Sequence, residues 1–170
     1  MNIRAEIITE DSAWESHYAD IDVDFNRHVA ASTLRRFSNM DELAEIELCI
    51  LHSNDDNIIN LNRQFRQQAK ATNVLSFPNF EFKWQEFAGY KHKDSVIYLG
   101  DIAFSLQSLQ KEADEQNKPI KDHYAHLLVH AILHLIGYDH VNDDDAEAME
   151  QLEINILQDL AIKSPYSQIR

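Results

Sequence analysis

The alternation of hydrophobic and polar positions along the chain predicts four β-strands. Residues 3–9 alternate, whereas residues 45–52 form a longer apolar run that suits a buried strand. The run at 73–77 is short and Pro78 ends it, and the run at 95–105 bends at a glycine, Gly100. We therefore expect a small β-sheet assembled from these segments.

Hydrophobic positions spaced three and four residues apart predict helices between and after the strands. The most apolar helix ends at Gly137, and the last one has a hydrophobic face that includes Met149 and Ile156. The expected helices cover residues 25–39, 55–66, 105–117, 121–136 and 143–161, and residues 79–94 are expected to form a loop. Strands and helices interleave. The pattern therefore predicts a single α+β domain, residues 1–170, in which a small mixed sheet packs with about five helices around the apolar helix 121–136.

The composition agrees with one helix-rich domain. The 170 residues are 44% hydrophobic and include only three glycines and three prolines, which favours helices joined by short connections. The single cysteine, Cys49, lies in an apolar run and is expected in the core; a lone cysteine fits a reducing compartment. No signal peptide and no apolar run long enough for a membrane span is evident, so we expect a cytoplasmic protein with no membrane contact.

The net charge of −14 argues against a uniformly basic protein that coats RNA. Residues 62–93, however, contain six basic residues against two acidic ones, so a local anion site remains open. Aromatic residues interleave with lysines there, in a mixture that could stack the bases of a single strand, although core packing accounts for at least half of them. The aromatic residues are Phe77, Phe80, Phe82, Trp84, Phe87 and Tyr90, and the lysines are Lys83, Lys91 and Lys93.

Three histidines in the segment 129-VHAILHLIGYDH-140 are candidates for metal ligands. His130 and His134 are four residues apart and face the same way on a helix. Gly137 favours a chain reversal that aims His140 back at them. His126 lies four residues before His130, but about 12 Å along the helix axis separates it from His134, so all four cannot share one ion. For His126, as for His123, an ordinary core or surface role is the better interpretation.

A metal held by three imidazoles keeps a fourth position open for water or substrate. In zinc proteases with the H-E-x-x-H pattern, a glutamate after the first histidine is the general base, and Ala131 stands there instead. The base would then be Asp139, a second water or an oxygen of the substrate itself.

The segment 130-HAILHLIGYDH-140 closely resembles the H-G-x-L-H-L-x-G-Y-D-H signature of the YbeY family, bacterial ribosomal RNA maturation factors that act as metal-dependent endoribonucleases. Three further segments agree in order: 61-LNRQFR-66, 71-ATNVLSFP-78 and 99-LGDI-102. The resemblance spans roughly residues 45–160. Ala131 replaces the usual glycine and Ala71 a common proline, and neither is a proposed ligand.

The resemblance implies one zinc ion per chain, bound by His130, His134 and His140, with Arg66 lining the cleft. It implies an α+β fold and cleavage of single-stranded RNA. The expected role is maturation of the 3′ end of 16S rRNA and ribosome quality control, with the small ribosomal subunit and its assembly factors as partners. Asn73 and Ser76 are substrate contacts by resemblance alone.

The residues also suggest a mechanism and leave two alternatives open. Arg66 lies in the positive segment and its forked guanidinium suits a phosphate, while Asp139 would orient a metal-bound histidine or carry a proton. One alternative is a metallohydrolase of another substrate such as peptides. The other is a non-catalytic ribosome assembly factor with a structural metal. The oligomeric state is not indicated by any pattern in the sequence.

Overall fold

The computed structural model describes residues 1–37, 45–81, 83, 85–86 and 96–166, and it contains a sheet of four strands. The strands are β1 (Asn2–Thr9), β2 (Glu45–Ser53), β3 (Val74–Pro78) and β4 (Val96–Ser105), in the order β1-β2-β4-β3. The pairs β1–β2 and β2–β4 are parallel, and β3 is antiparallel to β4. The predicted small mixed sheet is thereby confirmed.

Six helices accompany the sheet within the described residues, one more than the pattern predicted. They are α1 (Ala13–His17), α2 (Val23–Leu34), α3 (Asp55–Arg66), α5 (Leu106–Glu115), α6 (Ile120–Leu135) and α7 (Asp143–Asp159). The helix predicted over 25–39 begins earlier because the side chain of Asp22 caps it, accepting a hydrogen bond from the Phe25 amide at 2.8 Å. It ends at Leu34, and residues 38 and 39 lie outside the described part of the chain.

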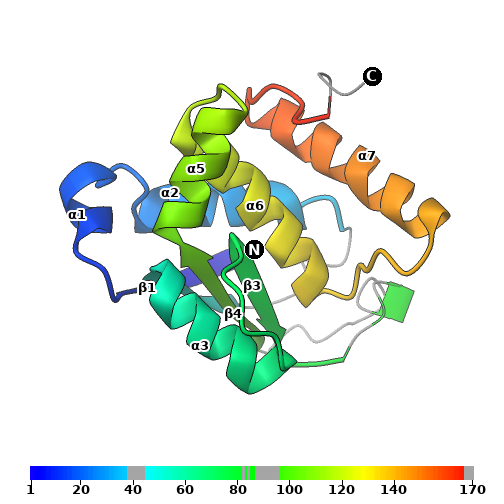
Figure 1. The fold of residues 1–170 in the computed structure, drawn as a ribbon. Coiled ribbons are helices and arrows are strands. Elements are labelled where there is room, and N and C mark those ends of the chain that lie inside the picture. Colours follow the sequence, from blue (N-terminus) through cyan, green and yellow to red (C-terminus); the bar gives the residue numbers. More distant parts are fainter. Residues whose placement is uncertain (38–44, 82, 84, 87–95, 167–170) are drawn as a thin grey trace.

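Helix α6 lies in the core, on the face of the sheet opposite to α3 (Figure 1). It packs against α2, α5, α7 and β3, and most of its residues are buried. Leu128 and Leu133 are fully buried, so truncation of either to alanine would cost about 2–5 kcal/mol of stability. The apolar character that marked this helix in the sequence therefore reflects burial of most of its surface, apart from the face that carries His126, His130 and His134.

Helix α3 covers part of the opposite face of the sheet, below it in Figure 1. Asn54 caps its start by accepting a hydrogen bond from the Asn57 amide at 3.0 Å. Ile58 packs against Leu75 of β3 and Ala103 of β4 in a second, smaller core. This packing fixes the C-terminal end of α3, where Arg66 lies, beside β3.

Gly100 interrupts the regular pairing of β4, as the predicted bend implied. The register between β2 and β4 shifts beside it, and its φ of +140° is one that other residues rarely adopt. A Cβ atom at this position would lie 2.2 Å from the carbonyl oxygen of Phe77. The close approach of β3 to β4 therefore requires a glycine here.

Cys49 corrects the prediction of a core cysteine. It is half-buried, because the inward positions of β2 are Ile46, Leu48 and Ile50 and the residues between them face the other side of the sheet. Burial first, then the charges of Asp101 and Glu6, raise the pKa of its thiol to about 11. Cys49 is therefore an unreactive thiol near neutral pH.

Part of the aromatic and basic segment lies outside the described residues: Phe82, Trp84, Phe87, Tyr90, Lys91 and Lys93, with most of the loop expected at 79–94. Of the remaining aromatics, Phe77 belongs to β3 and Phe80 is exposed just beyond it. No helix among the described residues combines the length and the apolar composition that crossing a membrane requires.

Candidate metal centre

The C-terminal end of α6 and the turn after it bring three imidazoles together. Gly137 adopts a φ of +101°, and the Tyr138 amide donates to the Leu133 carbonyl at 3.0 Å, which closes the helix and reverses the chain. The ring of His140 then lies with its centroid 5.1 Å from that of His130 and 4.7 Å from that of His134. One ring nitrogen from each histidine falls within 4.8 Å of the others.

Hydrogen bonds fix the tautomers of the two helical histidines. The Nδ1–H of His134 donates to the carbonyl oxygen of Tyr138 at 2.8 Å, and a carbonyl can only accept. The Nδ1–H of His130 donates to Glu153 at 2.5 Å. Burial by itself raises the pKa of Glu153, but hydrogen bonds from His126 and His130 outweigh it and lower that pKa to about 2, so the carboxylate is ionised. Both Nε2 atoms are left free to act as ligands.

The two Nε2 atoms lie 3.0 Å apart. Burial, together with the charge of His130, lowers the pKa of His134 to about 4, so this ring is neutral and its Nε2 presents a lone pair. With both Nδ1 atoms donating elsewhere, this spacing is accounted for by a cation between the two Nε2 atoms, either a proton carried by His130 or a bound metal ion. The donor set of His130, His134 and the exposed His140 therefore fits a zinc ion, which prefers nitrogen ligands at about 2.0–2.1 Å and keeps a fourth position open in three-histidine sites.

A cleft of about 780 Å³ opens at this centre and gathers all of the site residues predicted from the sequence. These residues are Arg66, Asn73, Ser76, His130, His134, Asp139 and His140, and Thr72, Phe80, His126, Tyr138 and Tyr166 also line the cleft. Residues of the segment 72–81 line the cleft beside those of α6. The cleft thus brings a basic side chain and a three-imidazole cluster to the same cavity.

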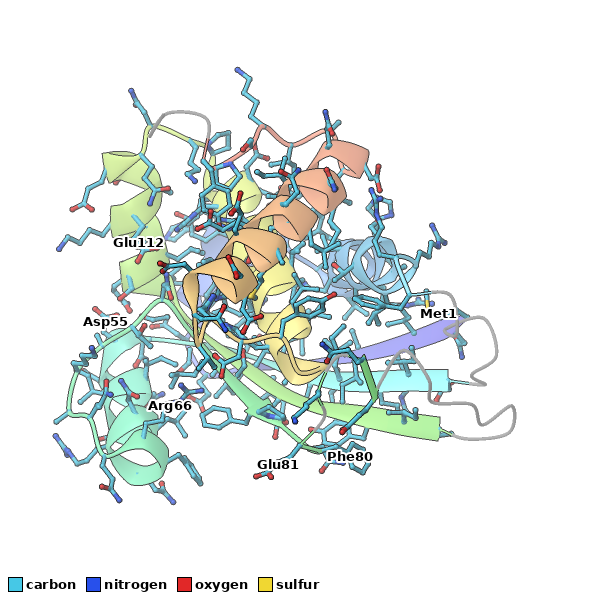
Figure 2. All side chains as sticks on the ribbon, turned by 90° about the vertical axis from the view of Figure 1, so that its right-hand side faces the viewer. Met1, Asp55, Arg66, Phe80, Glu81 and Glu112 are labelled. Atoms are coloured by element: carbon cyan, nitrogen blue, oxygen red, sulfur yellow. The ribbon has the colours of Figure 1, made fainter. Side chains whose placement is uncertain are left out.

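Arg66 reaches the cleft from the end of α3 (Figure 2). Its Nη2 donates to the carbonyl oxygen of Ser76 at 3.0 Å, and the residue is otherwise exposed. This bond uses one of the five N–H groups of the guanidinium, and the other four make no hydrogen bond to the described part of the chain, so they can bind an anion in the cleft.

Asn73 and Ser76, the substrate contacts expected from the resemblance, also form hydrogen bonds within the protein. Asn73 donates from Nδ2 to both oxygens of Glu112, at 3.1 and 3.0 Å, and its Oδ1 accepts from the Val74 amide. Ser76 is nearly buried, with its Oγ 3.5 Å from the carbonyl oxygen of Ala131. Both side chains hold the wall of the cleft in place.

Asp139 is exposed at the rim, where its Oδ1 accepts a hydrogen bond from the His140 amide at 2.8 Å. It therefore shapes the turn that carries His140. The carboxylate that contacts a candidate ligand ring belongs to Glu153, which sequence analysis missed. The available signal was its position: Glu153 lies on the hydrophobic face of α7, between Met149 and Ile156.

His126 and His123, for which a core or surface role was expected, both bond carboxylates. His126 is mostly buried, and its Nε2 donates to Glu153 at 3.1 Å. His123 is 3% exposed, and its Nε2 bonds Glu112 at 2.6 Å. Neither belongs to the three-imidazole cluster.

Comparison with known proteins identifies the family. The family model described as "Endoribonuclease YbeY" matches residues 12–161. The chain belongs to the YbeY family. A YbeY endoribonuclease of Paracoccus denitrificans (strain Pd 1222) is 40% identical over 161 residues, covering 95% of this chain and 88% of that protein. This membership confirms the resemblance inferred from the signature 130–140.

The fold also recurs in a solved structure. The solution structure of TM1509 from Thermotoga maritima matches with a TM-score of 0.54, at 18% sequence identity, over 93% of this chain and 92% of that one. At this level of identity the likeness concerns the fold alone, and it supports the α+β class predicted from the sequence.

Proposed function

We propose that this protein is a zinc-dependent endoribonuclease that cleaves single-stranded RNA. The observation that carries the proposal is that the His130/His134/His140 cluster and Arg66 line one cleft, in a chain of the YbeY family. The curated relative is named an endoribonuclease, and RNA offers a phosphodiester that such a cleft is suited to bind.

A zinc ion held by the three imidazoles would polarise a phosphoryl oxygen and lower the pKa of a water molecule in the cleft. The chain's own residues would do the rest. Arg66 would bind the phosphate through its free N–H donors and offset the charge that builds up on it. Asp139, exposed at the rim, would carry a proton to or from solvent, a role its contact with the His140 amide leaves open.

The space around the cleft suits a polymer better than a small molecule. A second cavity of about 730 Å³ adjoins the first, and both are lined by Asn73, His126, Leu127 and Tyr166. Lys118 and Lys163 line this second cavity together with the acids Glu112 and Asp122. The adjoining cavities would give a strand room to extend past Tyr166, and the attraction for its phosphates would come from Arg66 rather than from this second cavity of mixed charge.

Peptide hydrolysis finds less support. Position 131, where a glutamate base would stand, holds a fully buried alanine. The carboxylate that contacts His130, Glu153, is 1% exposed and engaged by three partners, so it is not available as a base for a water in the cleft.

The family also suggests the biological setting. We propose a role in ribosomal RNA processing, at the 3′ end of 16S rRNA, and in ribosome quality control. Its partners would be the small ribosomal subunit and its assembly factors, in the cytoplasm. These assignments rest on family membership rather than on a contact in the structure.

The direct test compares wild type with His134→Ala, purified in parallel so that contaminating ribonucleases affect both. Wild type loaded with zinc should cut a labelled single-stranded RNA and leave the matching duplex intact, and the variant should cut neither. Equal cleavage by the two preparations would reject the proposal, and a zinc-loaded wild type without any activity would favour a non-catalytic assembly factor.

A further inference from the structure

Glu153 is a charged residue in an apolar setting. It lies on the inward face of α7, next to Met149 and Ile156, and it is 1% exposed. A carboxylate removed from water is costly unless charged or hydrogen-bonding groups surround it. Its partners therefore explain why α7 carries an acid at this position.

The two oxygens of Glu153 have different partners. Oε1 accepts from the Nδ1–H of His130 at 2.5 Å. Oε2 accepts from the Nε2–H of His126 at 3.1 Å and from the hydroxyl of Tyr166. One carboxylate thereby joins a candidate metal ligand to a second histidine on α6 and to the segment that follows α7.

Tyr166 reaches this carboxylate because the chain folds back after α7. Figure 1 shows the red segment beyond α7 turning back near the connection between α5 and α6, and both stretches line the second cavity. The ring of Tyr166 meets that of His126 edge to face, with centroids 5.7 Å apart, and the Tyr166 amide donates to Ser164 Oγ at 3.2 Å. The C-terminal segment is thus held against the metal centre by specific contacts.

The three imidazoles are not supported in the same way. The Nδ1–H of His134 bonds a backbone carbonyl within its own turn, which the helix end alone can position. His140 is exposed. The support of His130 comes from a distant part of the chain, so its orientation depends on how α7 and the C-terminal segment pack.

We propose that Glu153 and Tyr166 are positioning residues for the metal centre: Glu153 fixes the tautomer and ring angle of His130, and Tyr166 holds Glu153. Carboxylate partners of metal-bound imidazoles typically change metal affinity by ten- to a hundredfold when removed. The C-terminal segment therefore contributes to metal affinity without touching the ion. This inference rests on the metal site of the proposed function.

The test measures zinc affinity by competition with a chromophoric chelator, independently of any RNA cleavage. The variants are Glu153→Gln and Tyr166→Phe, each close to the native shape. The matched controls are Glu147→Gln, an exposed acid on the same helix, and Tyr18→Phe, whose hydroxyl bonds Gln110 at 2.9 Å far from the cleft. Visible absorption of the Co²⁺ forms reports the geometry at the ion.

Glu153→Gln should weaken zinc binding by about ten- to a hundredfold and shift the Co²⁺ spectrum. Tyr166→Phe should weaken zinc binding by a smaller factor. Both controls should bind zinc as wild type does. If Glu153→Gln fails to melt cooperatively, the zinc affinity of Tyr166→Phe alone tests the inference. Variants that bind zinc as tightly as wild type would overturn the inference and leave the metal site intact. A wild type that binds no zinc would overturn the proposed function as well.

Discussion

His130 and His134 hold their Nε2 atoms 3.0 Å apart while each Nδ1 donates to a different partner. Because both Nδ1–H groups are committed, the two Nε2 atoms face each other at a distance that a shared proton or a bound metal ion accounts for, and the third imidazole beside them favours the metal ion. The relationship depends on α6 for the spacing, on Glu153 and Tyr138 for the tautomers, and on Gly137 for the turn that adds His140.

Zinc should stabilise the folded protein, because an ion that binds only the native state shifts the unfolding equilibrium. At a free zinc concentration one hundred times the Kd, the gain is about 2.7 kcal/mol, or roughly 5–11 °C in Tm for a chain of this size. Differential scanning fluorimetry with and without zinc measures it. Magnesium, which prefers oxygen ligands, should shift Tm little. The same zinc-induced shift in His134→Ala as in wild type would argue against the site.

Arg66 should be needed for RNA cleavage and not for metal binding. Arg66→Glu places a negative charge where the phosphate would bind, so we expect cleavage to fall by at least a hundredfold while bound zinc stays unchanged. Arg63→Glu is the matched control, since Arg63 is an exposed arginine of the same helix that does not line the cleft. Single-turnover cleavage of a short RNA is the measurement, and normal cleavage by Arg66→Glu would remove this residue from the site.

His52 should make stability depend on pH. It is 3% exposed, it bonds the Tyr124 hydroxyl at 2.8 Å, and burial lowers its pKa from 6.5 to about 4. Between these values the unfolded chain binds the proton and the native state does not, so stability falls as the pH drops from 6.5 to 4, by about 3 kcal/mol from this group. Urea unfolding of wild type and His52→Gln over this range isolates the effect. If the free energy of unfolding falls with pH equally in both proteins, His52 contributes nothing to the pH dependence.

Gly100→Ala should destabilise the sheet where β4 pairs with β3, the strand that carries residues of the cleft. The added Cβ would meet the Phe77 carbonyl oxygen at 2.2 Å, and the φ of +140° is strained for alanine, so we expect a loss of at least about 2 kcal/mol. Val96→Ala, at an exposed position of the same strand, should change stability by less than about 1 kcal/mol. The midpoints of urea denaturation compare the two, and an unaffected Gly100→Ala would show that β3 can move away.

Local patterns predicted those parts of the structure that depend on neighbours in sequence. The strands and α6 follow from spacing and apolar character, and the approach of His140 to the helix follows from one glycine at the helix end. Arg66 lies in the cleft because α3 packs on the sheet. In the sequence only the family resemblance placed it there, because the excess of basic residues in 62–93 does not show which of these side chains point into a cleft.

Tertiary placement explains what the sequence did not reveal. Glu153 is 23 residues from His130, and only the packing of α7 on α6 brings them together. Cys49 lies in a run of apolar residues, but the face of β2 to which it belongs is covered only in part, so the run did not imply burial. Helix α1 has five residues, too few to give a periodic pattern.

Zinc content tests the central claim most directly, because the account requires the chain reversal after α6 to deliver the third ligand. Wild type, His140→Ala and His28→Ala, an exposed histidine on α2, should be purified identically and their zinc measured by elemental analysis. We expect one zinc per chain in wild type and in His28→Ala, and well below one in His140→Ala. A full equivalent in His140→Ala would contradict the three-histidine centre.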